Sequence, residues 1–140
     1  MFLALNASVE LYKGGVVPLT EYAQRPYDRD ILVRVLVPKE NARFVYQSVR
    51  NTQTAFPVLP CAAAKLADGS IRAAIGARPG KAVLYTAAPE AGETAEEFAA
   101  RFAAEVKADI KTESNLRGGA EYRRHLAGVL TKRAVCRLEG

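Results

Sequence analysis

The clearest structural signal in the chain lies in residues 58–77, which read VLPCAAAKLADGSIRAAIGA. Two mainly apolar runs, Val58–Leu66 and Ile71–Ala77, flank the four residues Ala67–Ser70. An Asp-Gly pair between two apolar runs is a strong indicator of a tight hairpin, because glycine readily adopts the positive φ that such turns require. The sequence therefore predicts an antiparallel β-hairpin here.

The residues before this hairpin read as short strands separated by turns. Ser8–Tyr12 alternates polar and apolar residues, and the glycines of Lys13–Gly15 suit a tight turn after it. Ile31–Val37 is β-branched and nearly all apolar, which predicts a strand buried on both faces. Phe44–Val49 alternates and predicts a further strand, and Lys81–Thr86 predicts another after the hairpin.

After Gly92 the pattern becomes helical. Thr94 followed by Glu97 forms a capping box, the signature of a helix start. Apolar residues then recur at helical spacing and predict a core-facing side: Ala95, Phe98, Ala99, Phe102 and Val106. A second predicted helix, from about Ala120 to Val135, places four residues on one face: Tyr122, Leu126, Val129 and Leu130. The order of elements predicts an α+β fold, with helices packed on one face of a mainly antiparallel sheet.

Length and hydrophobicity limit the class of protein. A chain of 140 residues, 49% of them hydrophobic, can bury one sizeable core. No apolar run approaches the roughly 20 residues that span a bilayer, and the first six residues lack the basic start of a signal peptide. We therefore expect a soluble, cytoplasmic protein without a membrane partner.

The net charge of +5 is divided along the chain. Residues 1–89 carry +5, residues 90–110 carry −4 and residues 111–140 carry +4. A nucleic-acid-binding protein more often shows a continuous basic stripe. We therefore expect no nucleic-acid partner.

The inventory of reactive side chains is small. Cys61 and Cys136 are far apart in sequence, and His125 is the single histidine, so a metal site built from this chain is not expected. The sequence contains no GxSxG, GxxxxGK[ST], GxGxxG or HExxH motif. We therefore predict no catalytic residue.

The stretch Asn115–Ala134 resembles the last helix of the flavoprotein subunit of molybdenum hydroxylases, of the carbon monoxide dehydrogenase and xanthine dehydrogenase type. The matching positions are Tyr122, Arg123, Arg124, Leu126, Leu130 and Arg133. Upstream, residues 58–76 are similar to the family's hairpin. Three earlier segments are similar to the family's junction with the preceding domain and the strand after it: Ala7–Leu11, Val17–Tyr22 and Ile31–Pro38.

The resemblance implies a C-terminal-type domain of a subunit that carries FAD and passes electrons to an acceptor. The implied partners are an FAD-binding domain, a [2Fe–2S] subunit and a molybdopterin subunit, and a homo-oligomer stays open. Residues 1–28 would form an N-terminal hairpin and linker that resemble the junction to the FAD-binding domain. Residues 29–140 would form the C-terminal-type domain. The glycine-rich loops that hold most of the FAD belong to the preceding domains of such subunits.

The resemblance also indicates which residues would lie nearest the flavin. The family has a Lys-x-x-x-Arg-x-x-x-Asp pattern before the hairpin, and the corresponding positions here are Gln47, Asn51 and Ala55, with Arg50 as the adjacent cation. Arg50 and Asn51 are thus the cofactor-binding candidates. Tyr122, Arg123 and Arg124 form a structural motif, for which packing of the helix is the alternative to direct contact with a cofactor or partner.

Two functions from different classes follow. The first is an oxidoreductase component, not catalytic alone, that completes the FAD-bearing subunit. The alternative is a stand-alone interaction or dimerisation module without redox activity, which the neutral residues at Gln47, Asn51 and Ala55 favour.

Overall fold

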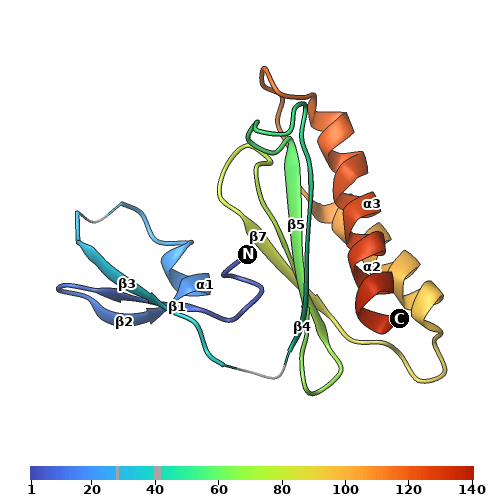
Figure 1. Cartoon of the computed structure of the whole chain (residues 1–140), viewed down its shortest axis with the longest axis horizontal. Coiled ribbons are helices and arrows are strands. Elements are labelled where there is room, and N and C mark those ends of the chain that lie inside the picture. The colour runs from blue at the N-terminus through green and yellow to red at the C-terminus, as the bar shows by residue number, and fades with distance from the viewer. Residues whose placement is uncertain (28, 40–41) are drawn as a thin grey trace.

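The computed structural model describes residues 1–27, 29–39 and 42–140 and contains two antiparallel sheets and two long helices (Figure 1). The first sheet has the order β2-β1-β3 and the second the order β4-β5-β6-β7. The elements are β1 (Ser8–Leu11), β2 (Gly15–Pro18), α1 (Leu19–Tyr22), β3 (Leu32–Leu36), β4 (Arg43–Val49), β5 (Leu59–Lys65), β6 (Ile71–Ile75), β7 (Val83–Ala87), α2 (Ala95–Asp109) and α3 (Ala120–Glu139).

The predicted hairpin is confirmed as β5 and β6. The two strands pair from Cys61 opposite Ile75 to Lys65 opposite Ile71. The Leu66 amide donates to the Ser70 carbonyl at 2.8 Å, and Gly69 has a φ of +83°. An Asp-Gly turn therefore fixes the register of the strands that form the middle of the second sheet.

The two long helices cover one face of the second sheet, as the α+β prediction requires (Figure 1). The capping box is present: the Thr94 hydroxyl accepts from the Glu97 amide at 3.3 Å, and the Glu97 carboxylate accepts from the Thr94 amide at 2.9 Å. Phe98 and Phe102 are buried as predicted, whereas Ala95 is exposed at the first residue of α2. Helix α3 continues to Glu139, four residues beyond the predicted end.

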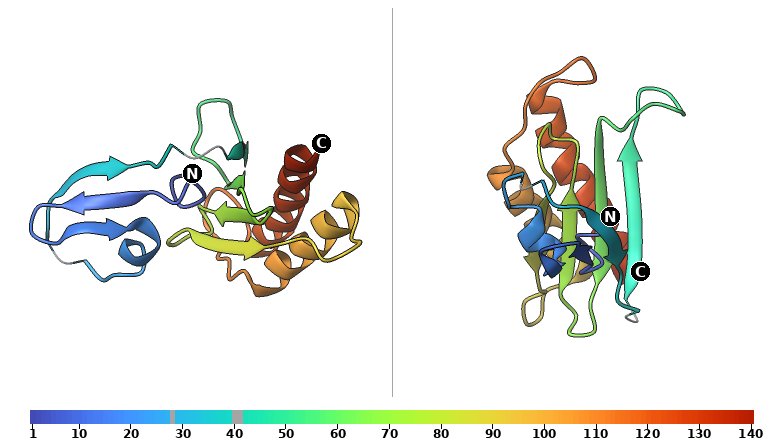
Figure 2. Two further views of the ribbon diagram at one scale, coloured as in Figure 1. Left: turned by 90° about the horizontal axis from the view of Figure 1, so that it is seen from below. Right: turned by 90° about the vertical axis from the view of Figure 1, so that its left-hand side faces the viewer.

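Strand β5 is buried on both faces. Cys61 and Ala63 contact the core under the helices, while Ala62 and Ala64 belong to a second cluster with Leu3 of the N-terminal segment. Because alanine side chains are short, layers on both faces can approach the strand closely. Figure 2 shows the second sheet between the helices and the N-terminal part of the chain.

The prediction that Ile31–Val37 is buried on both faces was wrong. All five residues of β3 are exposed, from Leu36 at 36% to Val33 at 52% among the apolar ones. Strand β3 is an edge strand of the first sheet, and α1 packs against β1 and β2. An apolar strand indicates that burial of its side chains is favourable. That burial requires another segment to pack against the strand.

A single mainly antiparallel sheet was expected, and the structure has two. We call the part of the chain up to the end of β3 the N-terminal unit, and the part from β4 to α3 the second unit. Strands from both ends of the N-terminal unit meet in the first sheet, because β3 pairs with β1. Asp28, at the expected boundary between residues 28 and 29, lies outside the described residues. The division of the chain into domains stays a prediction, and the pairing of β3 with β1 favours a boundary after Leu36.

The two cysteines differ in environment, and this difference predicts their reactivity. Both are free thiols; Cys61 is buried under the helices and Cys136 is exposed. Burial raises the pKa of the Cys61 thiol to about 12. At pH 8 only about one Cys61 side chain in ten thousand would be a thiolate, the form that reacts.

We predict that Ellman's reagent at pH 8 titrates one thiol per folded chain rapidly and the second only after unfolding. Cys136→Ser should abolish the rapid phase, and Cys61→Ser should preserve it. A rapid thiol in the Cys136→Ser variant would contradict the packing of β5 against the helices.

Candidate functional site

The first turn of α3 carries a buried arginine. Arg123 is 1% exposed and donates to four acceptors, three of them in the α2–α3 loop and one on the residue that precedes β5. Its Nε donates to the Val58 carbonyl at 3.1 Å, and its Nη1 donates to the carbonyls of Glu113 and Gly118, both at 2.6 Å. Its Nη2 donates to Oδ1 of Asn115 at 2.5 Å. The guanidinium thus joins α3, the α2–α3 loop and the residue that precedes β5.

The α2–α3 loop has to approach β5 closely for this arrangement. A Cβ atom on Gly118 would lie 2.9 Å from Cγ1 of Val58, so glycine is required there. Asn115 and Gly118 exchange two backbone hydrogen bonds of 3.1 Å, which close the loop into a tight turn. Burial, and secondarily the charge of Arg117, lower the pKa of Arg123. The acceptors that hold Arg123 are neutral, so its charge is stabilised by dipoles.

The other two residues of the predicted motif lie outside the core. Tyr122 is 49% exposed, although it was expected to share a face with Leu126 and Leu130, which are both buried. Arg124 is exposed. The buried side of α3 begins with Arg123, because the guanidinium can donate to several loop carbonyls, whereas a phenol has one proton and could satisfy only one of them.

The cofactor candidates Arg50 and Asn51 lie at the same end of the domain. Arg50 donates to the Ala55 carbonyl at 2.9 Å and to the Ser48 hydroxyl at 3.2 Å. The Asn51 amide donates to the Arg117 carbonyl at 3.3 Å. The β4–β5 loop is therefore braced internally and tied to the α2–α3 loop (Figure 1, top).

This end of the domain also presents apolar side chains to the surface. The Arg117 guanidinium lies over the Phe56 ring at 5.4 Å from its centroid, and Phe56 is nevertheless 75% exposed. Leu116 at the tip of the α2–α3 loop is fully exposed. We call these two loops, residues 50–58 and 110–119, the loop rim. The rim offers a cation-bearing, partly apolar contact surface.

The loop rim does not fit a flavin site by itself. The polar side chains of Arg50 and Asn51 make the bracing bonds described above, and Ala55 supplies no carboxylate. Gln47 lies on the same face of β4 as Val45 and Val49, which pack against the helix-facing core, and its buried Nε2 has no partner among the described residues. A bound flavin would need charged or free polar groups directed outward. The side chains at the rim therefore do not fit a flavin cradle by themselves.

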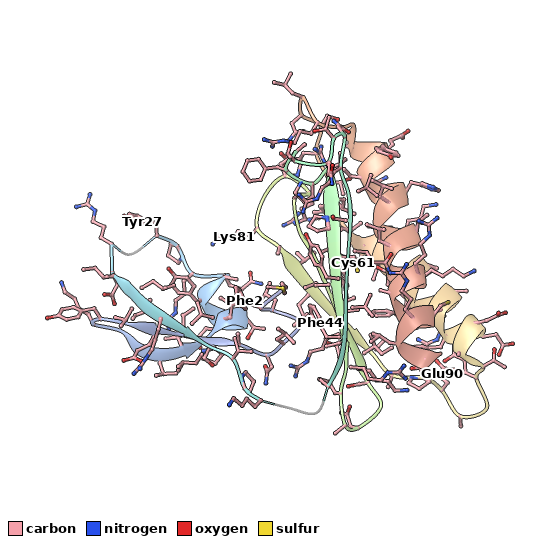
Figure 3. The ribbon with its side chains drawn as sticks, in the orientation of Figure 1. Phe2, Tyr27, Phe44, Cys61, Lys81 and Glu90 are labelled. Carbon is pink, nitrogen blue, oxygen red and sulfur yellow. The ribbon has the colours of Figure 1, made fainter. Side chains whose placement is uncertain are left out.

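A cavity of about 420 Å³ lies between the N-terminal unit and the β6–β7 turn. Figure 3 labels Tyr27 and Lys81, which line it from the two units. The Lys81 ammonium donates to the Arg25 carbonyl at 2.8 Å, and the Arg25 guanidinium pairs with Glu21 at 2.6 Å. The lining residues are Leu3, Leu19, Tyr22, Ala23, Arg25, Pro26, Tyr27, Lys81 and Ala82. Sequence reasoning missed this cavity, since these residues form no motif and neither Arg50 nor Asn51 lines it.

The comparisons with known proteins identify the fold. A family model described as the CO dehydrogenase flavoprotein C-terminal domain matches residues 44–138, more than half of the chain. The chain therefore belongs to this family, whose members form the C-terminal part of the flavoprotein subunit of molybdenum hydroxylases. No curated protein gives a significant sequence match.

Solved structures of such enzymes share the fold over almost the whole chain. Quinoline 2-oxidoreductase from Pseudomonas putida 86 has 19% identity and a TM-score of 0.76, with 99% of this chain and 54% of that chain covered. Carbon monoxide dehydrogenase from Hydrogenophaga pseudoflava has 23% identity and a TM-score of 0.76, with 98% and 54% covered. The reconstituted CO dehydrogenase from Oligotropha carboxidovorans has 19% identity and a TM-score of 0.76, with 99% and 54% covered. The chain thus spans about half the length of the solved chains it matches.

We predict that Arg123→Met destabilises the chain by at least about 3 kcal/mol, because several buried acceptors lose their donor and each unsatisfied group costs about 1–3 kcal/mol. The matched control Arg124→Met replaces the exposed neighbour and should change the free energy of unfolding by about 0.5 kcal/mol or less. Urea denaturation measures both. Equal stabilities of the two variants would contradict the anchoring role of Arg123.

Proposed function

We propose that this chain forms the second part of the flavoprotein subunit of a molybdenum hydroxylase and completes the FAD-bearing electron-transfer subunit. One observation carries the proposal: the chain superposes along nearly its whole length on solved subunits of this class and spans 54% of each. The family match over residues 44–138 places the resemblance on the C-terminal domain of such subunits.

The proposed partners are the FAD-binding domain, a [2Fe–2S] subunit and a molybdopterin subunit, in a complex of the xanthine dehydrogenase and carbon monoxide dehydrogenase type in the cytoplasm. FAD, when bound by the assembled subunit, would accept electrons and pass them to an acceptor. This chain would contribute by positioning the other parts of the complex. Arg123 fixes the loop rim, and the rim presents Phe56, Leu116 and Arg117 outward.

The second unit has its own hydrophobic core between the sheet and the helices α2 and α3. This core supports a role as a folded and separately stable part of the subunit. No helix among the described residues is long and apolar enough to cross a membrane. The isolated chain is proposed to lack oxidoreductase activity, because the redox group is held mainly by the other part of the subunit.

We predict that the affinity-tagged chain, expressed in its own host and purified gently, carries its partner polypeptides in stoichiometric amounts. Mass spectrometry should identify an FAD-binding polypeptide, unless the FAD-binding part belongs to the same chain, together with a [2Fe–2S] polypeptide and a molybdopterin polypeptide.

The Arg123→Met variant, which is destabilised at the loop rim, should retain less of each partner than the Arg124→Met variant. Recovery of the folded chain without an FAD-binding part, alone or as a homodimer, would contradict the proposed function and favour a stand-alone interaction module.

A further inference from the structure

The apolar side chains of strand β3 are only partly covered. In the first sheet, Val9 and Leu11 of β1 are 1% and 2% exposed, and both lie in a cluster that Leu19 and Tyr22 help to cover. Their direct partners across the pairing are Val35 and Leu32 of β3. Paired residues of antiparallel strands point to the same face. On this one face, therefore, β1 is buried while Val35 and Leu32 are 38% and 44% exposed.

The outer edge of β3 is also open. Strand β1 pairs with one side of β3, and the other side has no strand beside it among the described residues. Unpaired edges are normally protected by charged residues or proline. The one charged residue of β3, Arg34, is paired with Glu10 of β1. The opposite edge strand, β2, ends in Pro18, which cannot donate to an added strand.

The family match and the solved structures cover different parts of this chain. The family model for the C-terminal domain starts at residue 44, after β3. The solved flavoprotein chains nevertheless cover 98–99% of this chain, so residues 1–43 correspond to a part of those chains outside the C-terminal domain. The half of each solved chain that is not matched supplies a source for the missing cover.

We propose that β3 is the docking strand for the FAD-binding part of the subunit, which adds a strand to its free edge and covers Leu32 and Val35 with apolar side chains. This inference rests on the proposed function and assigns β3 as the surface on which the FAD-binding part docks. The added strand would supply main-chain hydrogen bonds along the edge, and the apolar cover would continue the core begun by Val9 and Leu11.

The test uses the 140-residue chain and, as probe, the FAD-binding polypeptide encoded beside or directly ahead of it in the same genome. Val35→Lys places a charge in the proposed interface, at a side chain already partly exposed. Val16→Lys is the matched control, because Val16 is 61% exposed on the opposite edge strand of the same sheet. Thermal unfolding of each free variant verifies that the fold is kept.

We predict that Val35→Lys weakens binding of the FAD-binding polypeptide at least tenfold by calorimetry, while Val16→Lys changes it less than twofold. Hydrogen exchange, which needs no variant, should show residues 31–37 protected in the wild-type complex. A wild-type complex with residues 31–37 unprotected and Val35→Lys binding unchanged would overturn the docking strand and leave the proposed function intact.

The remaining outcomes are distinguishable. Failure of the wild-type chain to bind the FAD-binding polypeptide at all would overturn the proposed function, and the docking strand with it. Self-association of the free chain that Val35→Lys abolishes, with no competition from the FAD-binding polypeptide, would assign β3 to a second copy and overturn the proposal.

Discussion

The structure of the second unit depends on one buried cation. The Arg123 guanidinium is surrounded by neutral acceptors from the strand end at Val58 and from the α2–α3 loop at Glu113, Asn115 and Gly118. Burying a charge is costly unless its hydrogen bonds are satisfied, so the loop, the helix start and the strand end have to be in place together. The rim formed by the β4–β5 and α2–α3 loops follows from this constraint, because Asn51 and Phe56 contact Arg117 of the same loop.

The local elements were predictable because their signals act within a few residues. Asp68-Gly69 specifies a turn, and Thr94 with Glu97 specifies a helix start. In both cases the hydrogen-bonded residues are only two or three positions apart in the sequence. The role of Arg123 was not predictable in this way, because its acceptors come from positions 58 to 118 and meet only in the folded chain. Helical spacing instead favoured Tyr122, which is half exposed.

The prediction that residues 31–37 form a strand buried on both faces was wrong for a different reason. Composition predicted burial for this strand, but both Leu32 and Val35 are exposed, because composition cannot say whether another segment covers them. The family resemblance pointed to Arg50 and Asn51, and the structure places both in a rim that braces itself. The cavity beside Lys81 combines residues from three separate stretches, and no periodicity or motif joins them.

The two units therefore differ in how well their strands are covered. Strand β5 is covered on both faces, whereas the outer edge and the apolar side chains of β3 have no cover among the described residues. In the proposed function, the chain positions the FAD-binding part of the subunit and does not hold the cofactor by itself. The most direct measurement is flavin absorbance of the desalted 140-residue chain after incubation with FAD, alone and with the FAD-binding polypeptide. The account predicts flavin eluting with the chain only when that polypeptide is present. One FAD retained per isolated chain would contradict it.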